Sequence, residues 1–184
     1  MKYCSECGQP VDHRIPDGDN RERAVCDACG IVHYQNPNMV LGCIPVWNDQ
    51  VLLCKRAIEP RRGYWTVPAG FMENDESIAE AAERETQEEA LADVEIGELQ
   101  AVVDVVHARQ VHIFFRATMR NDQFGAGIES LDVRLFDEAD IPWDDIAFPS
   151  TTFALKTYLE DRAAGVQRVH RIEMARMPFR PPKD

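Results

Sequence analysis

The chain has 184 residues, 45% of them hydrophobic, and a formal net charge of -12 at pH 7, so it can bury one core with a small appended module. The acidic balance argues against a nucleic-acid-binding protein, because such proteins usually present a basic face to the phosphate backbone. No 18-residue apolar run suggests a membrane span, and the start, "MKYCSECGQP", lacks the apolar stretch of a signal peptide. A cytoplasmic protein is therefore expected.

Four of the six cysteines form two C-x-x-C pairs, "CSEC" and "CDAC", and a glycine follows each pair. In a cytoplasmic protein such cysteines are more often metal ligands than disulfides. Two disulfides or two redox-active pairs are the alternatives, but neither accounts for the matched glycines, which suit a turn that aims backbone N–H groups at a thiolate. The pattern therefore predicts a zinc ribbon over residues 1–35, in which zinc is needed for folding. The predicted zinc ligands are Cys4, Cys7, Cys26 and Cys29.

Three nearby residues that could also bind metal are assigned structural roles. His33 follows the second pair, but four cysteines already complete a tetrahedral site. Cys43 and Cys54 lie in apolar, strand-like runs and are predicted to be buried thiols.

The rest of the chain alternates between strand-like and helix-like segments. Strands are predicted over residues 39–47, 51–57, 64–68, 94–119 (two strands that turn near 108–110) and 130–136. The first two should form a hairpin that turns at 48–50. A helix is expected to begin with Ser150 as its N-cap and to stop at Gly165. The tail, 166–184, is expected to be partly extended. These elements predict an α+β fold with a mixed sheet flanked by helices.

One helical segment is unusually acidic. Between Glu73 and Glu89 there are eight acidic side chains and one basic side chain, Arg84. "SIAE" matches a capping box, with Ser77 as the N-cap and Glu80 at the third helical position, so a helix should run to about residue 90. At about 100° per residue, one face of this helix begins apolar and ends acidic. The members of that face are Ile78, Ala81, Ala82, Glu85, Glu88 and Glu89.

An acidic patch on a core-facing side breaks a local rule, and such breaks concentrate at functional sites. Like charges four residues apart repel, and they lie at the carboxyl end of the helix, where the macrodipole is also unfavourable. Arg84 is four residues from Glu88 and is expected to neutralise that carboxylate only. The remaining carboxylates suit a hard divalent cation, Mg²⁺ or Mn²⁺. A solvated glutamate-rich helix is the alternative, but it would interleave lysines, and a di-iron bundle would need histidines.

The same residues resemble a known family. Gly70, then Glu76 after five residues, then "RETQEE" after seven more, resembles the Nudix box. The resemblance covers about residues 39–165, and the cysteine pairs resemble the zinc-ribbon branch of Nudix hydrolases. Three residues depart from the family pattern: Thr86 replaces an aliphatic residue, Leu91 a glycine, and Ala92 a larger aliphatic residue. The resemblance implies a Nudix-type α/β/α sandwich over 36–165, preceded by the zinc ribbon and followed by the tail.

The resemblance also implies roles for site residues. Glu85 and Glu89 would bind Mg²⁺ or Mn²⁺, with Glu88 as a further ligand or the general base. The carbonyl of Ala69 would add an oxygen ligand. Arg84 and Glu76 would form a supporting pair that fixes the carboxylates. A further carboxylate outside the helix usually completes such a site. Our candidate is Glu129, which precedes a predicted strand; an exposed loop glutamate is the alternative.

The implied reaction is hydrolysis of the pyrophosphate bond in a nucleoside diphosphate derivative. "AIEPRRGYWTVPAGFME" resembles the group that hydrolyses ADP-ribose and FAD, giving AMP with ribose 5-phosphate or FMN through a metal-activated water. The NADH-hydrolysing signature is missing after the box, which disfavours NADH. The expected partner is thus a small nucleotide rather than nucleic acid or a membrane, and the resemblance suggests a homodimer. Candidate substrate contacts are Arg61, Arg62, Tyr64, Trp65 and Phe114, although arginines on the surface and aromatic residues in the core are the alternative readings.

Other activities stay open at this point. NADH or a dinucleoside polyphosphate could be the substrate. The protein could also bind ADP-ribose or nucleic acid without catalysis, although the intact Glu85, Glu88 and Glu89 argue against a vestigial domain. His107 and His112 lie near strand ends and could serve either structure or function.

Overall fold

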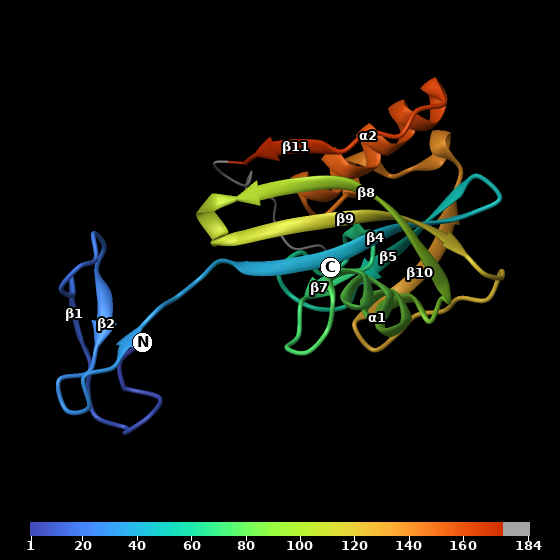
Figure 1. The fold of residues 1–184 in the computed structure, drawn as a ribbon. Helices are drawn as coiled ribbons and strands as arrows, with labels where there is room; N and C mark the ends of the chain where they lie inside the picture. The colour runs from blue at the N-terminus through green and yellow to red at the C-terminus, as the bar shows by residue number, and fades with distance from the viewer. Residues whose placement is uncertain (175–184) are drawn as a thin grey trace. The chain divides into compact units, whose positions relative to one another are not determined.

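A computed structural model describes residues 1–174, and the chain divides into two compact units between Pro37 and Asn38. The first unit is a small three-stranded antiparallel sheet (Figure 1). Its strands are β1 (Asp12–Arg14), β2 (Arg23–Val25) and β3 (Val32–His33). Such short strands bury little apolar area, which is why a unit of this size needs a metal or another cross-link for stability.

The second unit is built on one mixed sheet (Figure 1). The strand order is β10-β5-β4-β9-β8-β11, with β6 beside β5 and β7 beside β4. The β4–β9 and β8–β11 pairs are parallel, and the other pairs are antiparallel. The strands are β4 (Asn38–Trp47), β5 (Gln50–Arg56), β6 (Trp65–Thr66), β7 (Ala69–Phe71), β8 (Val94–Val105), β9 (Gln110–Met119), β10 (Ser130–Phe136) and β11 (His170–Glu173).

The predicted hairpins are confirmed. Trp47 pairs with Gln50 across a two-residue turn, in which Asn48 and Asp49 have φ angles of 47° and 68°. Positive φ at both central residues is the type I′ geometry that matches the twist of a hairpin, and asparagine and aspartate adopt it readily. The β8 and β9 strands turn through a short 3-10 helix, η1 (Val106–Ala108), followed by Arg109 in the left-handed region.

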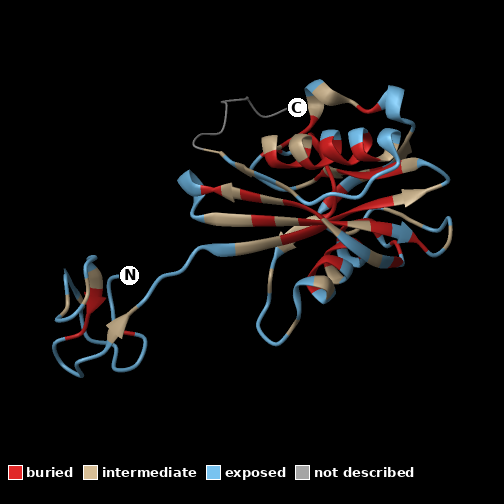
Figure 2. Cartoon of the chain, turned by 45° about the horizontal axis from the view of Figure 1, so that its top comes forward, coloured by how far each residue is buried: buried red, intermediate tan, exposed pale blue. Residues whose placement is uncertain are grey.

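Two helices cover opposite faces of the sheet, α1 (Ile78–Ala90) and α2 (Pro149–Ala164) (Figure 2). Alternate residues of a strand point to opposite faces, so Leu41 and Cys43 of β4 pack on the side of α1, whereas Ile44 packs on the side of α2. The α/β/α sandwich and the mixed sheet predicted from the sequence are therefore confirmed. Ile78 differs from the prediction, because it is 38% exposed and is absent from both cores.

The predicted capping box of α1 and the predicted stop of α2 are confirmed, whereas the predicted N-cap of α2 is wrong. The capping box of α1 is present: the Ser77 hydroxyl accepts from the Glu80 N–H, and the Glu80 carboxylate accepts from the Ser77 N–H. Ser150 is not the N-cap of α2. The N-cap is Phe148, because Pro149, with its fixed φ and missing N–H, suits the first helical position. Gly165 ends the helix in the left-handed conformation, as predicted.

The predicted strand over 64–68 is shorter than expected, since β6 covers two residues and β7 follows after a break. Two further 3-10 helices, η2 (Glu138–Asp140) and η3 (Trp143–Asp145), lead into α2. None of the helices among residues 1–174 has the length and apolar character needed to cross a membrane.

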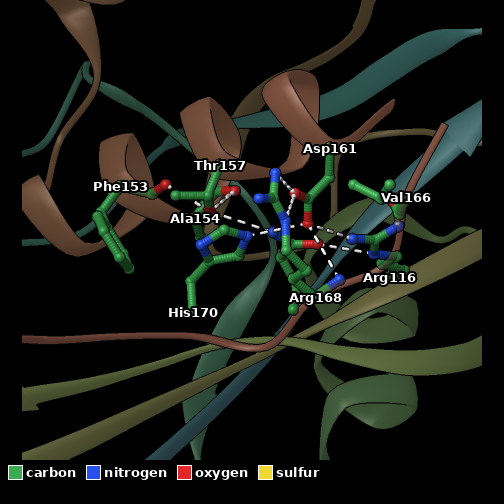
Figure 3. A network of polar contacts seen from close by, with 9 residues as sticks. Arg116, Phe153, Ala154, Thr157, Asp161, Val166, Arg168 and His170 are labelled. Atoms are coloured by element: carbon green, nitrogen blue, oxygen red, sulfur yellow. Dashed lines mark hydrogen bonds and ion pairs between the residues drawn. The ribbon is translucent and has the colours of Figure 1, made fainter. Parts of the chain in front are cut away.

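A buried carboxylate attaches the segment after α2 to the sheet (Figure 3). Asp161, at the end of α2, is fully buried and accepts hydrogen bonds from Arg116 at 2.8 Å, from Arg168 at 2.9 Å and from His170 at 2.9 Å. Burial opposes ionisation, but these donors outweigh it and lower the pKa of Asp161 to about 2. The network holds β11 in place beside β8. Because β11 is a strand within the predicted tail, the tail is partly extended, as predicted. Residues 175–184 of the predicted tail lie outside the described part.

Candidate active site

The four cysteines of the first unit come together as predicted. Their Sγ atoms all lie within 4.8 Å of one another, and the Cys4–Cys29, Cys7–Cys26 and Cys7–Cys29 separations are 3.6, 3.4 and 3.6 Å. Tetrahedral zinc with bonds of about 2.3 Å would place its sulfurs roughly 3.8 Å apart, so the donor set fits zinc. Gly8 and Gly30 have φ angles of 73° and 75°, and each N–H donates to the carbonyl of the first cysteine of its pair. The His33 ring lies 3.3 Å from the Cys4 sulfur.

In the second unit, the acidic helix face is buried where it meets β7. Ala81 and Ala82 are fully buried, and Glu85 and Glu89 on the same face are 9% and 6% exposed. The backbone N–H of Ala69 donates to the Glu89 carboxylate at 3.0 Å. A Cβ atom at Gly70 would overlap the Glu85 carboxylate. Glycine at this position therefore allows the helix carboxylates to lie directly against the β7 backbone.

Arg84 contacts more carboxylates than the sequence suggested. Its guanidinium makes a bidentate pair with Glu76 at 2.8 and 2.9 Å, and it also contacts Glu85 at 2.7 Å and Glu88 at 3.1 Å. The prediction that Arg84 neutralises one carboxylate only is wrong, because the five N–H donors of a guanidinium can serve several acceptors. A fourth contact, to the Phe71 carbonyl at 3.0 Å, links α1 to β7.

Burial and Arg84 act on these carboxylates in opposite directions. Burial raises the pKa of Glu89 to about 7 and also raises the pKa of Glu85, with smaller contributions from the neighbouring negative charges, including Glu129. Hydrogen bonds from Arg84, and then from the Glu73 N–H, lower the pKa of Glu76 to about 2. The pKa of Glu85 stays raised in spite of its contact with Arg84, and that of Glu89 in spite of the hydrogen bond from the Ala69 N–H, so further positive charge from a bound cation would stabilise both carboxylates.

The donor set around this face fits a divalent cation. The oxygens of Glu85, Glu88, Glu89 and Glu129 and the Ala69 carbonyl are hard ligands of the kind that Mg²⁺ and Mn²⁺ prefer. Within residues 1–174, however, the four cysteines are the one group of three or more histidine, cysteine or acidic residues whose ligand atoms all lie within 4.8 Å of one another. Arg84 occupies Glu85 and Glu88 instead. A cation binding here would compete with Arg84 for these two carboxylates.

The acidic face of α1 lines a cavity of about 730 Å³. Glu85, Glu88, Glu89 and Glu129 line it together with Ala69, so the candidate metal ligands share one space. Of the predicted substrate contacts, Phe114 lines the cavity. Arg61, Arg62, Tyr64 and Trp65 are not among its lining residues; Trp65 belongs to the core that packs under α2. An aromatic residue in a short strand more often packs in the core than contacts a ligand, and Trp65 does so.

Arg56 is a cavity residue that sequence reasoning missed. It is the last residue of β5, is 8% exposed, stacks over the Phe148 ring at 5.0 Å and donates to the Pro60 carbonyl at 2.9 Å. Burial lowers its pKa, and Glu89 and Glu129 partly offset this effect. Its place at the end of a strand that leads into an irregular loop was the signal available in the sequence, because such positions often carry function.

Comparison with known proteins identifies the family. Residues 37–154 match the family model described as NUDIX domain, and residues 2–35 match the model described as Nudix N-terminal, a zinc ribbon. The chain belongs to the Nudix family. A NUDIX hydrolase from Nitrosomonas europaea superposes with a TM-score of 0.90 and 52% identity, over 95% of this chain and 100% of that one.

Other relatives of this Nudix chain match smaller parts. A "NAD-capped RNA hydrolase NudC" from Stutzerimonas stutzeri (strain A1501) is 33% identical over 98 residues, which are 50% of this chain and 32% of that protein. The chain thus spans about a third of the length of this relative. An ADP-ribose pyrophosphatase from Streptococcus suis has a TM-score of 0.62 at 20% identity, over 74% of this chain and 100% of that one, and shows the fold alone.

The three departures from the Nudix pattern have local explanations. Thr86 is fully buried, and its hydroxyl donates to the Ala82 carbonyl at 2.8 Å and lies 3.0 Å from the Cys43 sulfur, so a polar pair replaces an aliphatic contact. Leu91 caps α1 with a φ of 50°, a conformation that glycine adopts more easily. Ala92 is buried in the core under α1. The predicted buried thiols, Cys43 and Cys54, are confirmed.

His112 lies in the wall of the Nudix cavity. Its Nδ1 is 3.0 Å from the Ser150 hydroxyl in the first turn of α2, and its Nε2 is 2.9 Å from the Gln110 side-chain oxygen. An amide oxygen accepts only, so Nε2 carries the proton and the Ser150 hydroxyl donates to Nδ1. Burial, with a smaller contribution from His107, lowers the pKa of His112 to about 4. His112 therefore links β9 to α2 as a neutral ring.

The Nudix unit is expected to lose stability as His112 is forced to ionise. Since the folded-state pKa is near 4 and the free value is 6.5, the unfolded chain binds this proton first. The contribution of neutral His112 to the free energy of unfolding is thus fully present above pH 6.5 and is lost as pH falls towards 4. Melting temperatures measured from pH 7 to 4.5 should fall less for His112→Gln than for the wild type, whereas His107→Gln, at an exposed position, should keep most of the slope. Equal slopes for all three proteins would contradict this role.

The zinc ribbon is expected to carry one zinc per chain. Replacing the buried Cys26 with serine should release the metal and unfold residues 1–37, while the Nudix unit keeps its own melting transition, because the two units have separate cores. Cys54→Ala, in the second unit, should retain the zinc. Elemental analysis and calorimetry measure both effects. Markedly less than one zinc in protein prepared without chelators would rule the site out.

Proposed function

We propose that this Nudix protein is a Mg²⁺- or Mn²⁺-dependent pyrophosphohydrolase that cleaves a nucleoside diphosphate derivative, with ADP-ribose and FAD as its expected substrates. One observation carries the proposal: two nearly buried carboxylates line one cavity and lie against the β7 backbone, Glu85 at Gly70 and Glu89 at the Ala69 N–H. Buried carboxylates of raised pKa are costly unless a cation offsets them. A metal site for a diphosphate accounts for that cost.

The chain supplies the positioning groups for such a reaction. Glu85, Glu89 and the Ala69 carbonyl would hold the cations, and Arg84 with Glu76 would fix the carboxylate rotamers. Divalent cations bound there would neutralise the diphosphate and make water more acidic. Glu88, the most exposed of the three carboxylates Glu85, Glu88 and Glu89, is the candidate for taking the proton from the attacking water, and Glu129 is the candidate for the carboxylate that completes the cation site.

The cavity also offers a cation for the substrate. Arg56 lines the same cavity as Glu89 and Glu129, and a guanidinium binds phosphate oxygens well. Three apolar residues, Val105, Phe114 and Met174, also line the cavity, and an apolar lining suits a nucleoside or flavin ring. A cavity of about 730 Å³ lies within the usual range for small-molecule sites. We therefore place the diphosphate between Arg56 and the acidic face.

A second candidate substrate class comes from the relatives. Two proteins named as NAD-capped RNA hydrolases match 98 residues of this chain at 33% and 31% identity. NADH and a NAD-capped RNA contain the same pyrophosphate bond, so they belong in the substrate panel. The homodimer suggested by the resemblance is part of the same proposal, and sedimentation measures it.

The test is a panel of ADP-ribose, FAD, NADH, NAD-capped RNA and diadenosine polyphosphates with Mg²⁺ or Mn²⁺. ADP-ribose should give AMP and ribose 5-phosphate, and FAD should give AMP and FMN, because a water activated by the bound cations would attack phosphorus. In ¹⁸O-labelled water, the label should appear in a phosphate of one product. Label on a ribose carbon, release of free ADP, or turnover without any divalent cation would overturn the proposal.

A further inference from the structure

The loop between β9 and β10 is attached to the carboxyl end of α1. The Gly125 N–H donates to the Ala90 carbonyl at 2.8 Å, and the Gly127 N–H donates to the Glu89 carbonyl at 3.1 Å. The last carbonyls of a helix have no partner within the helix. The loop therefore completes the hydrogen bonding of the turn that carries two of the acidic site residues, Glu88 and Glu89.

Gly127 approaches this turn more closely than any other residue type could. A Cβ atom at Gly127 would overlap the Glu88 carbonyl oxygen and would lie 2.8 Å from the Glu88 carbonyl carbon and 3.2 Å from the Glu89 Cα atom. These neighbours are backbone atoms and cannot rotate away. By contrast, a Cβ atom at Gly125 would meet the Leu91 Cδ1 atom at 3.6 Å, an ordinary contact. Position 127 therefore requires glycine, whereas position 125 has room for a Cβ atom.

The backbone of Glu129 is held on both sides. On one side, the turn formed by Gly127 and Ser130 is closed by the Ser130 N–H, which donates to the Gly127 carbonyl at 3.1 Å. On the other side, the Ala57 N–H, just after β5, donates to the Glu129 carbonyl at 2.8 Å. The Glu129 side chain lines the same cavity as Glu85 and Glu89. A shift of the loop at Gly127 would therefore move this carboxylate relative to the other two.

We infer that Gly127 is a positioning residue: its close contact with the last turn of α1 holds the loop so that Glu129 lies at the cavity that Glu85 and Glu89 also line, where it can join them in binding a cation. This inference rests on the proposed function, because it assigns Glu129 to the same metal site. The loop then acts as a fixed wall of the cavity.

The experiment is a double-mutant cycle that does not depend on turnover. The dissociation constant for Mn²⁺ is measured by electron paramagnetic resonance for the wild type, Gly127→Ala, Gly125→Ala, Glu129→Gln and the Gly127→Ala/Glu129→Gln double variant. Gly127→Ala and Glu129→Gln should each weaken binding by about tenfold. The double variant should bind no more than about twofold more weakly than Glu129→Gln, since both changes remove the same interaction. Gly125→Ala should stay within about twofold of the wild type.

Additive effects, or wild-type affinity for Gly127→Ala or Glu129→Gln, would overturn the inference. If Gly127→Ala fails to fold, amide hydrogen exchange of the wild type decides: the Gly127 N–H should exchange as slowly as the Leu91 N–H, which is bonded to the Gln87 carbonyl, and exchange at the rate of a free loop would refute the docking. If only the proposed reaction is wrong, the variants should still show the expected Mn²⁺ affinities, although the protein cleaves no pyrophosphate bond.

Discussion

Replacing Glu85 with glutamine is expected to lower turnover at least a hundredfold while the protein stays folded. Glutamine keeps the shape of the side chain but removes the charge that would hold a cation against the diphosphate. Losing one such transition-state interaction costs about 3 kcal/mol. Because burial raises the pKa of Glu85, the neutral side chain should leave the metal-free protein as stable as the wild type or more stable. Initial rates at saturating Mg²⁺ and thermal melting in EDTA measure the two effects.

Glu83→Gln is the matched control for this experiment. Glu83 lies on the same helix but is exposed and does not line the cavity, so this variant removes the same charge from α1 without touching the site. Its rate should stay within about twofold of the wild type, as expected for a screened surface charge. Equal activity of Glu85→Gln and the wild type at saturating Mg²⁺ would show that the acidic face does not bind the catalytic cation.

Asp161→Asn is expected to give the largest loss of stability among conservative substitutions in the second unit. Asp161 is fully buried and pairs with Arg116, Arg168 and His170. Removing its charge leaves Arg116, whose side chain is 14% exposed, without an anion. Breaking a buried ion pair in this way costs about 3 kcal/mol or more, which corresponds to a fall of roughly 6–12 °C in melting temperature for a protein of this size.

Glu160→Gln provides the comparison for Asp161→Asn, because Glu160 is the neighbouring residue on α2 and is exposed. It should change the melting temperature by no more than about 2 °C. In Asp161→Asn the backbone amides of β11 should also exchange faster than in the wild type, since the network holds that strand. A melting temperature unchanged from the wild type would show that the network contributes little.

Local signals in the sequence predicted the parts of the fold that depend on few residues. The α1 capping box needs only Ser77 and Glu80, and the hairpin turn needs only Asn48 and Asp49, so both were correct. The clustering of the four cysteines followed from their spacing and glycines. The burial of Glu85 and Glu89 on one helix face followed from the 3.6-residue period.

Features that depend on distant residues could not be predicted in the same way. The first turn of α2 was misread because Ser150 is a good N-cap in isolation, yet its hydroxyl contacts His112, from a strand 38 residues earlier. The packing of Trp65 in the core and the place of Arg56 in the cavity depend on how the loop after β5 folds back. The bidentate contact of Arg84 with Glu76 depends on the position of the loop before α1, which helical spacing alone does not give.

The parallel pairing of β4 with β9 at the centre of the sheet has a consequence for biosynthesis. The paired residues are separated by roughly seventy positions in the chain, and contacts this distant form slowly because the chain between them must first be closed into a loop. At about 5–20 residues per second, a ribosome would need roughly four to fifteen seconds to make β9 after β4. During that time one edge of β4 is open to other chains, and open edges promote aggregation. The nascent polypeptide, rather than the folded protein, is therefore the form that most needs protection by chaperones.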